Sequence, residues 1–430
     1  MQGTQEKVKN GKQGTVLCKE EKNNSKKYTE KGITLIALVV TIIILLILAG
    51  ITINMLLGEN GIIRTAQEAK NTWENAIIND QENLNSLIAE LDEILTDKSK
   101  DIYVYLYDDG TLAFSNASEP IEGKTVVKEY GNIKGQEYKS WADEDNNIVS
   151  DTPWFNETSL ITKVSIIDEI VPTSMSSWFD SCINLTEFEN IEKIDTSEVK
   201  SMSGMFDTCS SLATLDLSSF DTSNVTNMNG MFNHCDNLIE IIGLEKFDTS
   251  NVIDMEIMFA NCGSLTNLNL NNFNTSNVES MKAMFAGISL TNLDLSNFDT
   301  SSVKSMNGMF DHCINLTEIT GLEKFDTSNV TDMRAMFYEC NNLQNLNLSS
   351  FNTSKVTNMG DMFFNCRTLT SLDVSTFDTS RVSDMNHIFA GCENLTVIYV
   401  GDNWDLTNVE NTSNMFANCG VNTTTPKPSN

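Results

Sequence analysis

The sequence predicts an α/β repeat protein: a leucine-rich-repeat-like solenoid with a short strand and a short helix in each coil. One motif recurs between Asp195 and Cys419, and its phenylalanine returns every 25 to 27 residues. A fixed period of this size is typical of solenoids. Each copy also combines a strand-like and a helix-like spacing of apolar residues. The recurring phenylalanines are Phe206, Phe232, Phe259, Phe285, Phe310, Phe337, Phe363, Phe389 and Phe416.

The two spacings divide one coil into two elements. Leu212, Leu215 and Leu217 end in an alternating Leu-x-Leu, which predicts a short strand with one buried face. From Val225 to Cys235 the apolar residues follow the stripe of one helix face. Asp221 precedes this stripe as a candidate helix N-cap. A single coil cannot bury its apolar edge alone, so neighbouring coils must stack.

Changes in coil length fall at the predicted turns. Gly243–Lys246 and Gly321–Lys324 each bring an extra residue after the strand, and 286–288 replaces a longer turn. Loops tolerate such changes better than strands or helices do.

The repeated string Leu-x-x-Leu-x-Leu-Ser-x-Phe-Asp-Thr-Ser-x-Val-x-x-Met-x-x-Met-Phe-x-x-Cys resembles the BspA-like leucine-rich repeat surface proteins, also described as the mycoplasma-type lipoprotein repeat family. The resemblance covers more than half of the chain. It implies attachment to host matrix, to other cells or to mucosal surfaces. Phe220 and its equivalents stand where leucine-rich repeats usually carry Asn after the strand.

Composition and charge restrict the partners. The chain has 430 residues and a net charge of −31, so its main body is an unfavourable partner for nucleic acid or an anionic lipid surface. Residues 1–32 are the exception, with eight lysines against four glutamates. We therefore expect a positively charged leader followed by an acidic body.

The N-terminal part predicts a membrane anchor. Residues 33–57 contain no charged side chain over 25 residues, enough for a transmembrane helix. The lysines of 1–32 place that segment in the cytoplasm and the body outside the cell, as a single-pass protein of the cell surface.

Gly32 and Ile33 are candidate processing residues. The junction from Lys31 to Ile36 resembles a prepilin-type signal, which implies cleavage after Gly32 by a prepilin peptidase and methylation of Ile33. Ala37 occupies the position where pilins usually carry Glu. An uncleaved signal anchor is the alternative.

The remaining segments divide the chain further. Residues 58–97 predict an extracytoplasmic helix or stalk, 98–172 a small β-rich capping domain, 173–420 the solenoid and 421–430 a disordered tail. A hairpin turning at Asp109–Gly110, and further strands at 125–127 and 162–167, are expected in the capping domain. Trp154 is a candidate plug for the first coil, or the wall of a ligand pocket with Trp141.

For each group of side chains that could react or bind a metal, a structural role is the simpler explanation. Nine of the ten cysteines share one coil position, where stacking favours buried free thiols over disulfides. The repeated Asp suggests calcium, but Asn274 and Asn352 replace it, which favours capping. His234 and His312 are expected in surface turns. We expect no enzyme activity, cofactor or metal.

The outward face of the strands is the predicted binding surface. A host or cell-surface protein or glycan is the expected partner, and a pilin-like or pseudopilin subunit that displays the solenoid is the alternative function. The predicted binding residues are Thr214, Asp216, Asn267, Asn269, Asn292, Asp294, Asn345, Asn347, Ser371 and Asp373.

Overall fold

The computed structural model describes residue 41, residues 101–142 and residues 148–428. The chain forms two compact units, 1–96 and 97–430. The predicted leader, transmembrane helix and stalk, with Gly32 and Ile33, lie outside the described residues except for Thr41. Within the described part, no helix has the length and apolar content needed to cross a bilayer.

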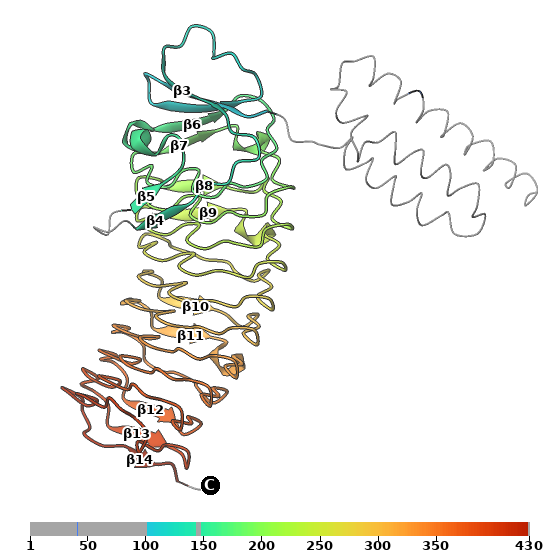
Figure 1. The fold of residues 1–430 in the computed structure, drawn as a ribbon. Helices are drawn as coiled ribbons and strands as arrows, with labels where there is room; N and C mark the ends of the chain where they lie inside the picture. Colours follow the sequence, from blue (N-terminus) through green and yellow to red (C-terminus); the bar gives the residue numbers. More distant parts are fainter. Residues whose placement is uncertain (1–40, 42–100, 143–147, 429–430) are drawn as a thin grey trace, which may run out of the picture. The chain divides into compact units, whose positions relative to one another are not determined.

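The second unit begins with a sheet that runs directly into the solenoid (Figure 1). The sheet order is β3-β1-β2-β6-β7. β1 and β2 pair in antiparallel fashion around Asp109–Gly110, and β6 pairs in parallel with β2 and β7. This confirms the predicted hairpin and strands. The strands are β1 (Tyr103–Tyr107), β2 (Thr111–Ser115), β3 (Val126–Asn132), β6 (Lys163–Ile166) and β7 (Glu187–Glu189).

Trp154 covers the first coil, as predicted for a plug. Its side chain is fully buried, and its Nε1–H donates to the Trp178 carbonyl oxygen at 2.6 Å. Phe114 contacts Trp154 edge-on and stacks on Trp178 at 5.1 Å between centroids. Full burial excludes Trp154 from the wall of a ligand pocket. The 3-10 helix η1 (Phe155–Leu160) follows, and β4 (Ser140–Ala142) pairs with β5 (Ile148–Ser150).

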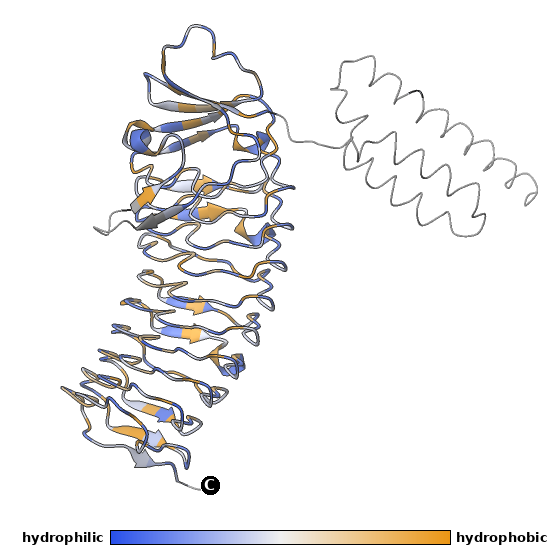
Figure 2. Ribbon diagram, viewed as in Figure 1, coloured by the Kyte–Doolittle hydropathy of each residue, from blue (hydrophilic) through white to orange (hydrophobic). Residues whose placement is uncertain are grey.

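The solenoid coils stack in parallel and share one core with the capping region. Apolar and polar residues alternate along its strands (Figure 2). Residues 266–270 and 344–348 occupy strand positions without forming strands. The strands are β8 (Thr214–Asp216), β9 (Glu240–Ile242), β10 (Asn292–Asp294), β11 (Glu318–Thr320), β12 (Ser371–Val374), β13 (Val397–Val400) and β14 (Thr425–Pro426).

The prediction of a short helix in each coil is wrong. None of the described residues from 101 to 428 lies in an α-helix; the segment from Met228 to Cys235, like its equivalents, is a run of tight turns. Gly230 and His234 adopt positive φ angles of 61° and 53°. Left-handed residues at both places interrupt any α-helix. Each coil repeats this pair two residues before and two after its core phenylalanine.

Hydrogen bonding explains why the turns imitate a helical pattern. The N–H groups of Met231 and Cys235 donate three residues back, to Met228 and Phe232. Those of Gly230 and Phe232 donate instead to the next coil, at 2.8 and 3.0 Å. Consecutive turns closed by i to i−3 hydrogen bonds have nearly as many residues per turn as an α-helix. The apolar stripe therefore has helical spacing without helical hydrogen bonds.

We call this side of the solenoid the turn edge: the residues from Met228 to Cys235 and their equivalents in every coil. Backbone bridges join its coils without interruption from Ser201 to Asn411. Beneath them, the core phenylalanines stack from Phe179 to Phe416, and the centroids of successive rings lie 5.5–6.0 Å apart.

Buried threonine hydroxyls form a second set of connections between coils, in the segment between the strands and the turn edge. Thr327 is fully buried; its Oγ1 donates to the Asn352 carbonyl at 2.9 Å and accepts the Asn352 N–H at 2.8 Å. Thr275 and Asp299 repeat the arrangement. One hydroxyl thus supplies both a donor and an acceptor, so burying it leaves no polar atom unsatisfied.

Residues 421–428, part of the predicted disordered tail, are ordered. Within 421–430, β14 pairs in parallel with β13, and the Lys427 ammonium lies 2.7 Å from the Asp373 carboxylate. Backbone pairing of Thr425–Pro426 continues the stack beyond the predicted end of the solenoid at 420.

Replacing Ala335 by glycine discriminates the turn from the helix. Ala335 has a φ of 54°, so glycine relieves strain, and we expect the free energy of unfolding to rise by about 0.5–1 kcal/mol. In a helix the same change costs about 1 kcal/mol. Gly308→Ala, at a φ of 60°, is the reverse control and should destabilise. Urea denaturation of both variants measures the sign; loss of stability in Ala335→Gly contradicts the turn.

Candidate functional site

The structure places the predicted binding residues on one side of the solenoid, which we call the strand face. Thr214 and Asp216 lie in β8, Asn292 and Asp294 in β10, and Ser371 and Asp373 in β12. Asn267, Asn269, Asn345 and Asn347 occupy the equivalent positions of the two coils without a strand. All ten side chains are exposed except that of Asp373, which is half-buried.

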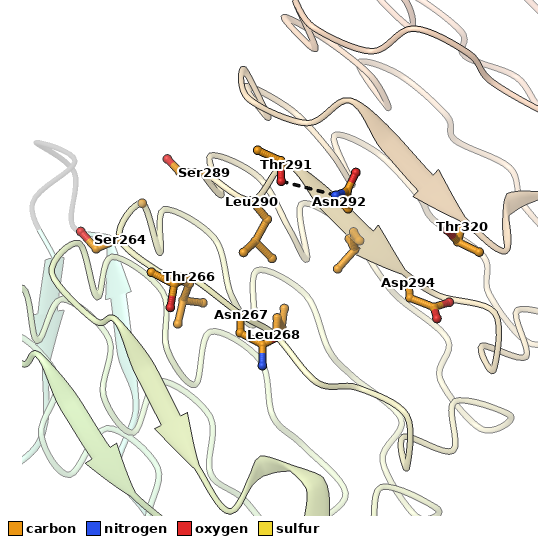
Figure 3. A pocket seen from close by; sticks show the side chains of 13 residues that line it. Ser264, Thr266, Asn267, Leu268, Ser289, Leu290, Thr291, Asn292, Asp294 and Thr320 are labelled. Atoms are coloured by element: carbon orange, nitrogen blue, oxygen red, sulfur yellow. Dashed lines mark hydrogen bonds between the residues drawn. The ribbon is translucent and has the colours of Figure 1, made fainter.

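A groove interrupts this face between residues 263–268 and β10 (Figure 3). Its volume is about 620 Å³. Asn267, Asn292 and Asp294 of the predicted set line it, with Thr266, Thr291 and Ser289. Leu268, Leu290 and Leu293 complete the lining and supply apolar contact. The groove therefore combines neutral hydrogen-bonding groups with a few apolar ones.

A second groove of about 320 Å³ lies on the other side of the β10–β11 pair. Asn345 and Asn347 line it together with Gln344, Glu318 and Glu323. Thr320 lines both grooves. The two depressions thus flank one pair of strands, and a chain-like ligand that crosses this pair would contact both.

The inserted residues explain where strand pairing stops. β9 and β11 pair with the strand before them, and each is followed by a Gly-Leu-Glu-Lys turn, η3 (Leu244–Lys246) or η4 (Leu322–Lys324). Gly243, at a φ of 90°, lies so close to the Ser218 backbone that a Cβ would approach it within 2.5 Å. The inserted turn thus packs against the preceding coil. The coil that follows the turn has no paired strand on this face. Before β8, the 3-10 helix η2 (Ile191–Lys193) ends in the same Glu-Lys sequence.

Backbone hydrogen bonds hold two aspartates of the strand face in place. The Asp216 Oδ1 accepts the Ser218 N–H at 2.9 Å, and Asp294 does the same with Ser296. Bonds from these serines lower the pKa of both aspartates. Both carboxylates are therefore ionised at neutral pH and offer acceptors toward the solvent.

The repeated Asp that follows Phe makes no helix cap, because no helix follows it. Asp221, for example, accepts the Ser223 N–H at 3.0 Å in a tight Asx turn, and Asn274 makes the same bond to Ser276. Asn serves this purpose as well as Asp, which explains the exchange. In the part of the chain that the structure describes, no group of three or more His, Cys, Asp or Glu is arranged to hold a metal ion.

The repeated cysteines are free thiols, as predicted. Eight are buried and Cys419 is partly buried. The thiol of Cys340 donates to the Phe310 carbonyl oxygen of the preceding coil at 3.0 Å, and six others make the equivalent bond. Burial raises the pKa of Cys340 and of Cys366, so both remain thiols rather than thiolates. His234 and His312 are exposed in turns, also as predicted.

One family model, described as "Mycoplasma protein of unknown function, DUF285", matches residues 173–265, 239–320 and 314–427. The chain belongs to this family. The match confirms the mycoplasma-type family that the repeat resembles. DUF285 carries no assigned function, so the function is argued below from the surface itself.

Three solved structures are similar to this DUF285 chain. A leucine-rich cell surface protein of Faecalibacterium prausnitzii A2-165 shows 19% identity and a TM-score of 0.34, over 72% of this chain and 92% of that one. A leucine-rich repeat protein of Eubacterium ventriosum shows 15% and 0.31, over 77% and 96%. One of Bacteroides ovatus shows 13% and 0.28, over 75% and 91%. No curated protein matches the chain.

Two aspartates, the buried Asp180 and the half-buried Asp207, lie near the N-terminal end of the turn edge. Asp180 is 2% exposed, and its Oδ2 has no hydrogen-bond partner. Burial and the neighbouring Asp180 raise the pKa of Asp207 to about 7, although Thr208 and Asn233 donate to Asp207 Oδ1 at 3.0 Å. Desolvation therefore outweighs these two hydrogen bonds.

Asp207→Asn should stabilise the protein more at pH 8 than at pH 5. The folded-state pKa exceeds the unfolded value, so the folded protein keeps a proton that the unfolded chain releases between pH 4 and 7. Stability from Asp207 is complete below the unfolded pKa and is lost as pH rises through the folded one. Denaturant midpoints of both proteins at pH 5, 6, 7 and 8 measure the difference. A difference that stays constant with pH contradicts the assignment.

Proposed function

We propose that the chain is a surface recognition or adhesion protein, anchored in the membrane through residues 33–57, whose strand face binds its partner. The observation that carries the proposal is the interrupted strand face, where neutral amides and hydroxyls recur from coil to coil beside two grooves. Such groups favour a hydrogen-bonding ligand such as a glycan or an extended protein segment. Repetition raises the strength of weak contacts through multivalency.

A binding role without catalysis is part of this proposal. The buried cysteines are enclosed in the core, and two of the three histidines are exposed in turns, away from the strand face. Neither arrangement pairs a nucleophile with a base. The BspA-like resemblance of the repeat favours the same role.

Arginine substitutions in the first groove test the proposal. In Asn267→Arg/Asn292→Arg, two long charged side chains fill the space between residues 263–268 and β10, so retention on mucin-coated or matrix-protein-coated surfaces should fall about tenfold or more. The control, Asn315→Arg, changes an exposed residue that lines neither groove and should bind normally. Equal binding by all three proteins contradicts a site in this groove.

The alternative function, a pilin-like or pseudopilin subunit, rests on the Lys31-Gly32-Ile33 junction. Mass spectrometry of the mature N-terminus separates the two pathways. We expect methylated Ile33, because the junction resembles a prepilin signal; an intact Met1 indicates an uncleaved anchor instead. Shearing cells then decides assembly: retention in the membrane fraction supports the surface protein, and recovery in sheared filaments supports the subunit.

A further inference from the structure

A pair of aromatic side chains breaks the pattern of the turn edge. The residue that directly follows each core phenylalanine is small or polar in every other described coil, but Tyr338 and Phe364 occupy this position in two adjacent coils. Their rings stack at 4.7 Å between centroids and 8° between planes. The other coils show that the fold does not require aromatic residues there. Their residues at this position are Asp180, Asp207, Asn233, Ala260, Ala286, Asp311, Ala390 and Ala417.

Histidines close both ends of this stack. The His312 ring lies 5.3 Å from Tyr338, and the His387 ring meets Phe364 edge-on at 6.1 Å. The faces of the two aromatic rings are thus occupied along the solenoid axis. Tyr338 and Phe364 are both half-buried, so their edges form the accessible surface. We call these four residues the aromatic ridge.

Carboxylates surround the ridge. Glu339 follows Tyr338 directly in the chain, and Asp311 and Asp361 each lie beside one of the two histidines of the ridge. Burial, followed by the charges of Glu339, Asp361 and Asp311, raises the pKa of Tyr338. Arg334 is already paired with Asp361, with 3.3 Å between its Nη2 and the Asp361 Oδ2. His312 Nδ1 lies 2.6 Å from Asp311 Oδ1, and His387 Nδ1 lies 3.6 Å from Asp361 Oδ1. The three carboxylates outnumber the one arginine named here, so the ridge favours a cationic partner.

We propose that the aromatic ridge and its acidic rim form a second interaction surface, which binds a lysine-rich or arginine-rich segment of another protein. The long aliphatic stem of such a side chain packs on the ring edges, and its cationic head reaches Asp311 or Glu339. Tyr and aromatic neighbours with charged rims are typical of binding hot spots. A second copy of this chain is a poor occupant, since each copy carries a net charge of −31.

Two peptides of equal charge test the surface on the full-length protein in detergent. One is labelled decalysine, and the other is ten residues of 2,4-diaminobutyric acid, whose side chains are two methylenes shorter. We expect decalysine to bind about tenfold more tightly, because its longer stems cover the ring edges. Tyr338→Ala/Phe364→Ala should abolish most of this preference. Alanine occupies the same position at Ala260 and Ala286, so the variant should fold.

Charge variants separate the site from the general acidity of the body. Asp311→Asn/Glu339→Gln should weaken binding of both peptides about fivefold or more, whereas Asp216→Asn/Glu240→Gln, which removes two charges from the strand face, should not. Equal weakening by both variants overturns the proposal, as does a lysine preference that survives in the alanine variant. A peptide of residues 1–31 that binds the ridge more tightly than decalysine overturns the assignment to another protein and gives the ridge to the chain's own leader.

Discussion

Backbone pairing between successive coils along the turn edge determines the rest of this structure. Alternate N–H groups of each turn segment donate to the next coil, and the others close tight turns within their own coil. This alternation requires two left-handed residues around every core phenylalanine. It also fixes the distance between coils near the usual spacing of β-strands. At that distance the phenylalanine rings stack and each cysteine thiol reaches a carbonyl of the coil before it.

The two sides of the solenoid therefore differ in regularity. The turn edge is continuous from Ser201 to Asn411, while strand pairing on the opposite face stops after each inserted Gly-Leu-Glu-Lys turn. Variation is tolerated on the strand face because the turn edge already holds the coils together. The interruptions leave the polar grooves of the strand face, and the aromatic ridge lies on the continuous side. Each proposed surface is thus a local departure from the repeat.

Much of this architecture could be predicted from the sequence. The repeat period predicted the stacked coils, and the alternating leucines predicted the strands. The repeated Leu, Met, Phe and Cys residues are buried, as expected. The helix was wrong because successive turns space their apolar residues almost as a helix does. Gly204, Gly230 and Gly308, which recur two residues before the core phenylalanine, were the available signal, because glycine so placed indicates a left-handed position rather than a helix interior. Strand-face positions were predicted correctly; the grooves and the Thr327 hydroxyl bridges depend on register between coils, which no single coil's sequence contains.

The central claim, that coils are held by burying repeated side chains against their neighbours, is tested most directly at Phe310. Its ring is fully buried and stacks between Phe285 at 5.9 Å and Phe337 at 5.5 Å. Urea denaturation of Phe310→Ala should show a loss of about 3–5 kcal/mol in the free energy of unfolding. Ile314→Ala, at a side chain that is 46% exposed, should change it by less than about 0.5 kcal/mol. An unchanged stability in Phe310→Ala would contradict the stacked core.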